Sequence, residues 1–395
     1  SASLDYSRGH GSRGGPQFVT NEDGSQSLVN VTSSSHDYSR TLSGQLNQSL
    51  LDLGKWTSLK AARATAKAGD ASYTAAEQDL LIRVATAYFD VLTAEDALKF
   101  AQANEQALNR QMEQAQQRFE VGLSAITDVN DAKAQHDTSV ANVITAQNTL
   151  DDNEEALRQL TNKEPGTLKG LREKLPMDKP EPADPDEWVS VAVAQNPTLH
   201  SYAQQLEAAK ANVQTARSGH LPTLNGQVLY SKTPSWSDNS ASSFNEAFHT
   251  NSERWSTTVG LTLNVPLFSG GFTQSRVRQT IFNRDNAQDQ FELQKRLVER
   301  STRNSYRAVI AGASQVEATG QAVVSAQSSL DATQAGYEVG TRTIVDVLIS
   351  QQQLLQAQSS YSQARHAFIL NGLRLKQAVG VIEVKDLEAV NALLE

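Results

Sequence analysis

The pattern of apolar and polar positions along the chain follows two different periods. From Trp255 to Leu267 apolar side chains occupy every second position, and small or polar side chains lie between them. A period of two is typical of a β-strand with one apolar and one polar face, and ~9–11 residues suffice for a tilted strand to cross a membrane. The alternation recurs at 224–230 and, more weakly, at 42–50. One such segment also fits a half-buried strand of a soluble sheet, but four related segments favour strands that span a membrane.

The second period is helical. Residues 54–122 contain no proline, and their apolar positions recur at the spacing of one helix face: Leu80, Leu81, Val84, Ala87, Tyr88, Val91, Leu92 and Leu98. A helix of this length would reach roughly 100 Å. Residues 272–339 repeat the design, and shorter returning helices are predicted at 127–160 and 345–379. Such long helices need neighbours in an assembly for stability.

The chain contains an internal duplication. Residues 118–129 recur at 336–347, and the glycines within them are 340 − 122 = 218 positions apart. Tyr88 and Tyr306 have the same offset, 306 − 88 = 218. A constant offset over this span indicates two copies of one structural unit. A helix predicted at 187–219 has its counterpart before residue 1, so we expect an opening helix, and any signal peptide, upstream of this chain.

The duplication divides the chain into seven predicted parts. They are a β-hairpin at 1–54, long and returning helices at 55–161, a linker at 162–186, an opening helix at 187–219, a second β-hairpin at 220–271, a second pair of helices at 272–379 and a tail at 380–395. The segments 8–37 and 231–254 are rich in Ser, Asn and Gly, and we expect them to form exposed outer loops.

Charge and composition exclude several classes of protein. The chain has 35 basic and 44 acidic residues and a net charge of −9, without a Lys/Arg-rich run, so no nucleic-acid partner is expected. It has no cysteine, and therefore no disulfide or thiolate metal site. No apolar stretch of roughly 18 residues is present, which excludes a membrane-spanning helix. Any crossing of a membrane would use strands.

Catalytic patterns are missing from the sequence. The seven histidines fall singly, without a His-x-x-x-His pair or a carboxylate at ligand spacing, and we interpret each as a surface residue. No nucleophile elbow, phosphate loop or zinc motif is found. We therefore expect no enzyme, no catalytic residue, no cofactor and no metal.

Closure of the sheet sets the assembly. Four strands cannot form a closed barrel, and an open edge leaves backbone groups unpaired in lipid. The protomer must therefore share a barrel with copies of itself. Three protomers would supply twelve strands, an even number within the usual range.

Several longer runs of residues resemble the TolC family of outer-membrane factors over essentially the whole chain. The runs are 86–92, 118–129, 219–224, 322–332 and 340–348. The resemblance implies a mixed α and transmembrane β fold, in which each protomer gives four strands to a shared twelve-stranded β-barrel that continues into a long periplasmic α-helical barrel. The linker at 162–186 and the tail at 380–395 would pack as an equatorial belt around the helices.

The same resemblance implies a function. The chain would be a homotrimeric exit duct in the outer membrane of a Gram-negative cell, with its helical part in the periplasm. It would be a passive channel for tripartite drug efflux, type I protein secretion or both. Its partners would be a periplasmic adaptor protein, an inner-membrane pump of RND or ABC type, and outer-membrane lipid.

The repeated turns carry the expected mechanism. Gly122 and Gly340 suit left-handed helix ends at the tip of the assembly. Asp128 and Asp346 suit the start of the following helix, where the dipole favours a carboxylate, and a charged ring near the axis is the functional alternative.

The resemblance adds roles for particular side chains. Thr127, Asp128, Tyr337 and Arg342 match positions that link neighbouring tip helices and hold the entrance shut, with Arg342 and Asp128 as a charge-assisted pair.

The constriction departs from the family pattern. Asp346 matches the first of two aspartates of the constriction ring, whereas Ile349 replaces the second. One acidic and one apolar ring should select cations less strongly and gate partly by dewetting.

Aromatic residues at the ends of the predicted strands suit the membrane interface: Tyr230, Trp255 and Phe268.

Two other classes remain open. A soluble coiled-coil scaffold fits the helices, but the apolar face of residues 255–267 would then lie exposed. A periplasmic adaptor also has helical hairpins, but it lacks this repeat.

Overall fold

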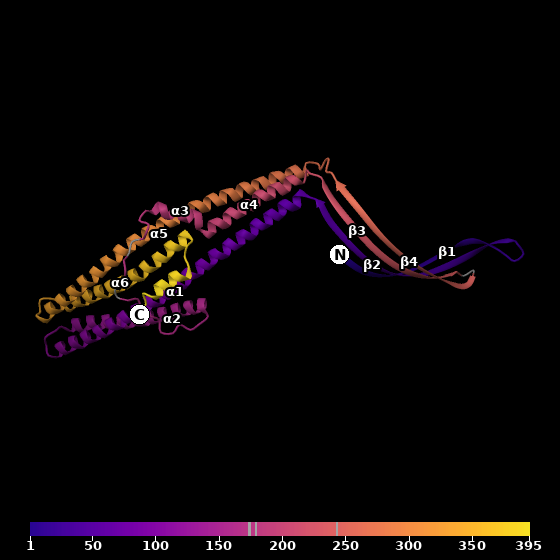
Figure 1. Ribbon diagram of the computed structural model, residues 1–395. Helices are drawn as coiled ribbons and strands as arrows, with labels where there is room; N and C mark the ends of the chain where they lie inside the picture. Colours follow the sequence, from indigo (N-terminus) through magenta and orange to yellow (C-terminus); the bar gives the residue numbers. More distant parts are fainter. Residues whose placement is uncertain (173–174, 178–179, 242–243) are drawn as a thin grey trace. The chain divides into compact units, whose positions relative to one another are not determined.

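The computed structural model describes residues 1–172, 175–177, 180–241 and 244–395. The chain forms two compact units, one of residues 1–62 and 209–284 and the other of residues 63–208 and 285–395. The first unit contains the strands, and the second contains most of the helical residues (Figure 1). Two of the predicted segments are described only in part. Residues 173–174 and 178–179 of the predicted linker and residues 242–243 of the second predicted β-hairpin lie outside the described residues.

The four strands form one antiparallel sheet in the order β1-β2-β3-β4. Their bounds are β1 Ala2–Thr20, β2 Gln26–Leu51, β3 Thr223–Ala241 and β4 Phe244–Asn264. The two copies of the repeat meet where β2 pairs with β3, although these strands are far apart in the sequence. Strands β1 and β4 each have a partner on one side only, so the sheet of this chain has two open edges.

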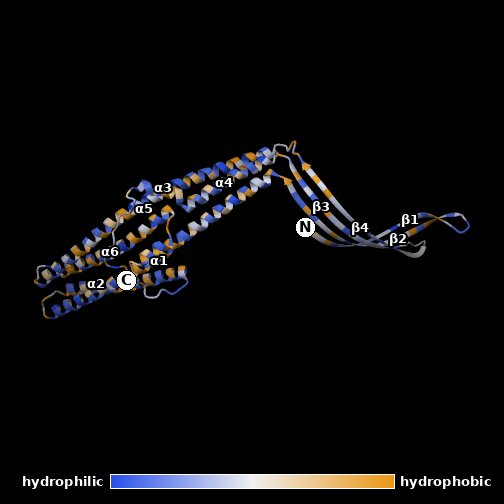
Figure 2. Ribbon diagram, viewed as in Figure 1, coloured by the Kyte–Doolittle hydropathy of each residue, from blue (hydrophilic) through white to orange (hydrophobic). Residues whose placement is uncertain are grey.

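The strand pairing places apolar side chains on one face of the sheet, called the apolar face below. Leu4 lies opposite Leu42, and Val228 lies opposite both Leu46 and Val259. These side chains are exposed in the single chain, from 38% for Val228 to 74% for Leu4 and Val259. In β4 the apolar residues that alternate with polar ones run from Trp255 to Leu263, directly after the polar residues 249–254 (Figure 2). An exposed apolar surface of this extent on a regular sheet requires a nonpolar environment.

The expectation of long outer loops at 8–37 and 231–254 is wrong. Strands β1 and β2 pair without interruption from Ala2 opposite Gly44 to Thr20 opposite Gln26. Serine and asparagine have low strand propensity, but backbone pairing and cross-strand hydroxyl contacts outweigh it here. Ser7 and Ser39 lie 2.7 Å apart between their hydroxyl oxygens, and so do Ser34 and Ser240. The strands therefore extend well beyond the apolar part of the sheet.

Two long helices and two returning helices form a pair of hairpins, and most of their residues belong to the second unit. Helix α1 runs over Leu53–Glu120, α2 over Ile126–Thr161, α5 over Phe272–Glu338 and α6 over Ile344–Val379. Each long helix coincides with a segment that has no proline and in which apolar residues recur at the helical period. The matching lengths of α2 and α6, 36 residues each, reflect the internal duplication.

The opening helix predicted at 187–219 is two helices. Helix α3 covers Pro185–Gln195 and α4 covers Pro197–Ser218. Asn196 between them has an extended backbone (φ −63°, ψ 118°), because the ring of Pro197 disfavours the helical conformation at the preceding residue. The Asn196 side chain donates to the carbonyl of Ala378 at 3.0 Å and caps α4 by accepting from the Leu199 amide at 3.0 Å.

The helical unit has several clusters of buried apolar side chains. The largest joins α1, α3, α4, α5 and α6 and includes Phe89, Val316 and Val379. A second cluster packs α1 against α2, and a third, around Val347, joins the tip ends of α5 and α6 to Leu108 of α1. The two hairpins are therefore held together at the tip as well as along their length.

The described part of the linker packs against the helices and the tail. Leu171 forms a β-bridge with Leu394, beyond helix α7 (Val384–Asn391). Tyr88 of α1 donates to the carbonyl of Lys169 at 2.9 Å. Tyr306, its counterpart in the repeat, donates to the carbonyl of Ala183 at 2.5 Å. The duplicated tyrosines thus fasten the two ends of one linker.

Candidate functional site at the tip of the helical hairpins

The two turns at the tip have the same local geometry. Gly122 has φ 81° and Gly340 has φ 78°, values that favour glycine. The amide of Leu123 donates to the carbonyl of Arg118 at 2.7 Å, and the amide of Thr341 donates to that of Gly336 at 2.8 Å. These bonds satisfy carbonyls at the ends of α1 and α5, so each long helix stops at an equivalent place.

The start of α6 is capped by a reciprocal pair. The hydroxyl of Thr343 accepts from the amide of Asp346 at 3.3 Å, and the Asp346 carboxylate accepts from the amide of Thr343 at 2.9 Å. Hydrogen bonds from the backbone and hydroxyl of Thr343 lower the pKa of Asp346, and Arg342 lowers it further. Asp346 therefore remains ionised while it caps the helix.

Tyr337 joins the two hairpins at the tip. It is 8% exposed, and the guanidinium carbon of Arg118, at the end of α1, lies 5.1 Å from its ring centroid. This is cation–π distance, and burial is the main cause that raises the pKa of the Tyr337 hydroxyl. Neither this hydroxyl nor the Arg118 Nε has a hydrogen-bond partner among the described residues. The contact between Arg118 and Tyr337 was not predicted from the sequence, because it joins distant segments.

The predicted gate residues lie close together in the chain fold but do not all touch. Asp128 accepts from the Ser124 hydroxyl at 2.6 Å, and its charge raises the pKa of Tyr337. Thr127 and Arg342 are exposed. No ion pair joins Arg342 to Asp128 within the described part of the chain, which includes both residues. The charge of Arg342 acts instead on Asp346, whose pKa it lowers.

The predicted constriction residues lie on α6. Ile349 is 49% exposed, one helical turn after Asp346. Ile349 lines a pocket with Val345 and Gln352 of α6 and with Asp131 and Gln135 of α2.

The aromatic residues predicted at the membrane interface lie on or next to the sheet. Tyr230 and Trp255 are on the apolar face, opposite Thr257 and Lys232. Phe268 follows β4, beyond the other end of the apolar segment, and is 91% exposed. Trp255 and Phe268 thus bracket the apolar part of β4.

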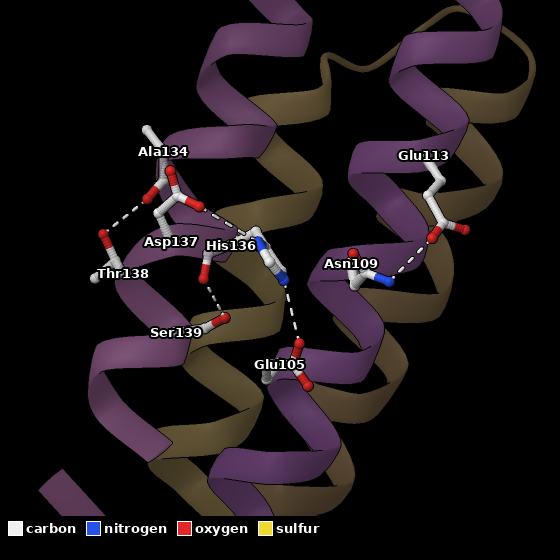
Figure 3. Close-up of polar contacts among 8 residues, drawn as sticks. All are labelled: Glu105, Asn109, Glu113, Ala134, His136, Asp137, Thr138 and Ser139. Carbon is white, nitrogen blue, oxygen red and sulfur yellow. Dashed lines mark hydrogen bonds and ion pairs between the residues drawn. The ribbon is translucent and has the colours of Figure 1, made fainter. Parts of the chain in front are cut away.

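The interpretation of every histidine as an isolated surface residue is wrong. His366 is 4% exposed and hydrogen-bonded to Thr93 at 2.8 Å. His136 of α2 lies 3.1 Å from Glu105 of α1 (Nε2 to Oε1) and 3.5 Å from Asp137 (Figure 3). His249 contacts Asp238 at 2.5 Å across β3 and β4. Helix and strand pairing supply carboxylate partners that are distant in sequence, although no group of three or more potential ligands suited to a metal is found among the described residues.

This chain is similar in sequence to a family of known proteins. The sequence pattern of the outer membrane efflux protein family matches residues 3–163 and 188–381. The chain belongs to this family. The outer membrane protein TolC of Escherichia coli (strain K12) is 39% identical over 350 residues, which cover 88% of this chain and 70% of that protein. TolC of Vibrio cholerae is 38% identical over 346 residues, with coverage of 88% and 78%. The predicted membership of the TolC family of outer-membrane factors is confirmed.

A more distant relative and two solved structures agree with this assignment. The alkaline protease secretion protein AprF of Pseudomonas aeruginosa is 29% identical over 360 residues, covering 90% of this chain and 72% of that protein. The outer membrane protein VceC of Vibrio cholerae has a TM-score of 0.70 at 18% identity, covering 96% of this chain and 87% of its own. A membrane protein from Pseudomonas aeruginosa has a TM-score of 0.71 at 19% identity, covering 95% and 84%. At these identities the structures show a shared fold.

Family membership confirms the predicted location in the outer membrane and the general function of an outer-membrane exit duct. A scaffold or an adaptor is not favoured. Within the described residues, no helix combines the length and the apolarity needed to cross a membrane.

Proposed function

We propose that this chain is one protomer of a homotrimeric exit duct, in which three four-stranded sheets close into one twelve-stranded barrel. The observation that carries the proposal is the exposed apolar face of a sheet with two open edges. Pairing β1 of one protomer with β4 of the next satisfies the backbone groups that lipid leaves unpaired. The number three is taken from the resemblance to the TolC family, and twelve strands lie within the usual range.

The helices continue the duct into the periplasm. Four helical segments with polar exposed surfaces from each protomer would form a helical barrel, with the described linker and tail as its equatorial belt. The relatives support both efflux and secretion: one is named an outer membrane efflux protein, and two are named as protease secretion proteins. An inner-membrane pump of RND or ABC type and a periplasmic adaptor would supply cargo and energy. The duct itself would perform no chemistry.

The tip acts as the gate. The Arg118–Tyr337 contact and the apolar cluster around Val347 hold the two hairpins of one protomer together. Arg342, exposed and without an ion pair to Asp128 in its own protomer, links to Asp128 and Thr127 of a neighbouring protomer. The rings of Asp346 and Ile349 narrow the entrance. Opening therefore requires the separation of charged contacts at every protomer boundary.

Single-channel recording in a planar lipid bilayer tests this gate. Arg342→Ala and Tyr337→Ala should each raise conductance, because the first removes the link between protomers and the second removes the ring that Arg118 contacts. Arg278→Ala, an exposed arginine of α5 remote in sequence from the tip, serves as the control and should leave conductance unchanged. Unchanged conductance in both tip variants would contradict the gate, and the absence of pores in the wild type would contradict the duct.

A further inference from the structure

Two arginines and two aromatic residues form a cluster on the apolar face, just beyond the end of its continuous band of apolar rows. The cluster consists of Arg8, Tyr38, Arg40 and Trp236, and we call it the arginine cluster. The Tyr38 and Trp236 rings stack with centroids 6.0 Å apart and planes 14° apart. The guanidinium carbon of Arg8 lies 5.5 Å from the centroid of Tyr38, and that of Arg40 lies 5.3 Å from the centroid of Trp236. The four side chains come from three strands.

The strand register fixes the level of the arginine cluster. The continuous band of apolar rows that includes Leu46 and Val259 ends with Leu4 opposite Leu42, and Arg40 and Arg8 follow two and four residues further along their strands. At about 3.3 Å per residue this is roughly 7–13 Å along the strand, or roughly 5–10 Å of depth in a tilted strand. The headgroup layer extends roughly 5–8 Å beyond the hydrocarbon core. The arginines therefore lie at the level of lipid headgroups.

The free atoms of the arginines favour an anion. A guanidinium that stacks on a ring uses its flat face and keeps its in-plane N–H donors available. Neither Arg8 nor Arg40 forms an ion pair with a carboxylate, or a side-chain hydrogen bond, within the described part of the chain. The nearby Lys232, by contrast, is neutralised by Glu253. Asp238, one row beyond Trp236 on the same face, has His249 as its partner, so neither it nor Glu253 pairs with the two arginines.

We propose that the arginine cluster binds the phosphate groups of outer-leaflet lipid headgroups. Arginine forks match phosphate oxygens in a bidentate way, and Tyr38 and Trp236 are the amphipathic residues that prefer the interface. This inference rests on the proposed barrel, because the barrel turns the apolar face and the arginine cluster towards lipid. It adds a lipid class to the outer-membrane location.

The test is native mass spectrometry of the full-length trimer in detergent, titrated with bisphosphorylated lipid A or with lipid A freed of phosphate. Wild type should prefer the phosphorylated lipid. Arg8→Gln with Arg40→Gln should weaken its binding about 25-fold, from about fivefold for each arginine near a charged surface. Arg8→Lys with Arg40→Lys, which keeps both charges, should stay within about fivefold of the wild type.

A matched control removes the same charge from the opposite face of the sheet. Arg13 and Arg254 are exposed. In the strand register they occupy rows that alternate with the rows of the apolar face, so their side chains lie on the other face of the sheet. Arg13→Gln with Arg254→Gln should bind phosphorylated lipid as the wild type does. The proposal would be overturned if both double glutamine variants bound phosphorylated lipid A equally weakly. It would also be overturned if the wild type bound the two forms of lipid A equally well. Pores formed by the same samples in a phosphatidylcholine bilayer separate these outcomes from failure of the barrel, which would abolish the pores.

Discussion

His366 of α6 should make the helical unit less stable in mild acid. Its ring is 4% exposed and lies against Phe89, with ring centroids 5.5 Å apart. The hydroxyl of Thr93 donates to the carbonyl of Phe89 at 2.7 Å, so it accepts from His366 Nδ1 at 2.8 Å. The neutral Nδ1–H tautomer fits this arrangement, and a second proton would place a buried charge in an apolar cluster.

The size of the effect follows from the pKa of His366. Burial lowers this pKa from 6.5 to about 4, with Arg365 lowering it further and Asp96 opposing the change. As the pH falls below 6.5, His366 becomes protonated in the unfolded chain, whereas in the folded chain it stays neutral until the pH reaches about 4. The contribution of neutral His366 to the free energy of unfolding is therefore fully present above pH 6.5 and declines between pH 6.5 and about pH 4. The loss is roughly 2 kcal/mol for each protomer between pH 7 and pH 5.

Urea unfolding of the helical unit, followed by far-ultraviolet circular dichroism at pH 7 and pH 5, measures this loss. His366→Gln should remove most of the pH dependence, because the amide does not titrate. His200→Gln is the matched control, since His200 is an exposed histidine of the same helical unit, and it should keep the slope of the wild type. Equal slopes for the wild type and His366→Gln would refute the reasoning.

Three further predictions concern the tip and the belt. Arg118→Gln should remove about 1 kcal/mol of cation–π contact with Tyr337 in each protomer, or about 3 kcal/mol if three protomers open together. The open probability in bilayer recordings should then rise roughly 100-fold. An unchanged open probability would contradict the role of this contact. Asp346→Asn, which keeps an acceptor for the cap on α6, should shift the reversal potential under a salt gradient towards zero, and no shift would exclude Asp346 from the constriction. Tyr306→Phe should speed amide exchange around Ala183 about fivefold by removing one hydrogen bond, whereas unchanged exchange would show that the belt is held elsewhere.

The sequence by itself determined the local structure and the family. The helical and strand periods depend on neighbouring residues only, so the long helices and the alternating strand around Val259 were predictable. The duplication was likewise readable, and so were the positive-φ glycines Gly122 and Gly340, because a left-handed helix end has a strong glycine preference. The predicted loops failed because composition reports propensity, and the backbone pairing that overrode it is not local.

Only the tertiary structure decided which distant side chains meet. The pairing of β2 with β3 brings Tyr38 beside Trp236, and the packing of the hairpins brings Arg118 to Tyr337 and His366 to Thr93. Each of these contacts joins segments far apart in the sequence, and a shift of one residue in a strand would turn its side chains to the other face. The elements of this duct are therefore encoded locally, whereas its tip contacts, its buried histidine and its arginine cluster depend on register and packing.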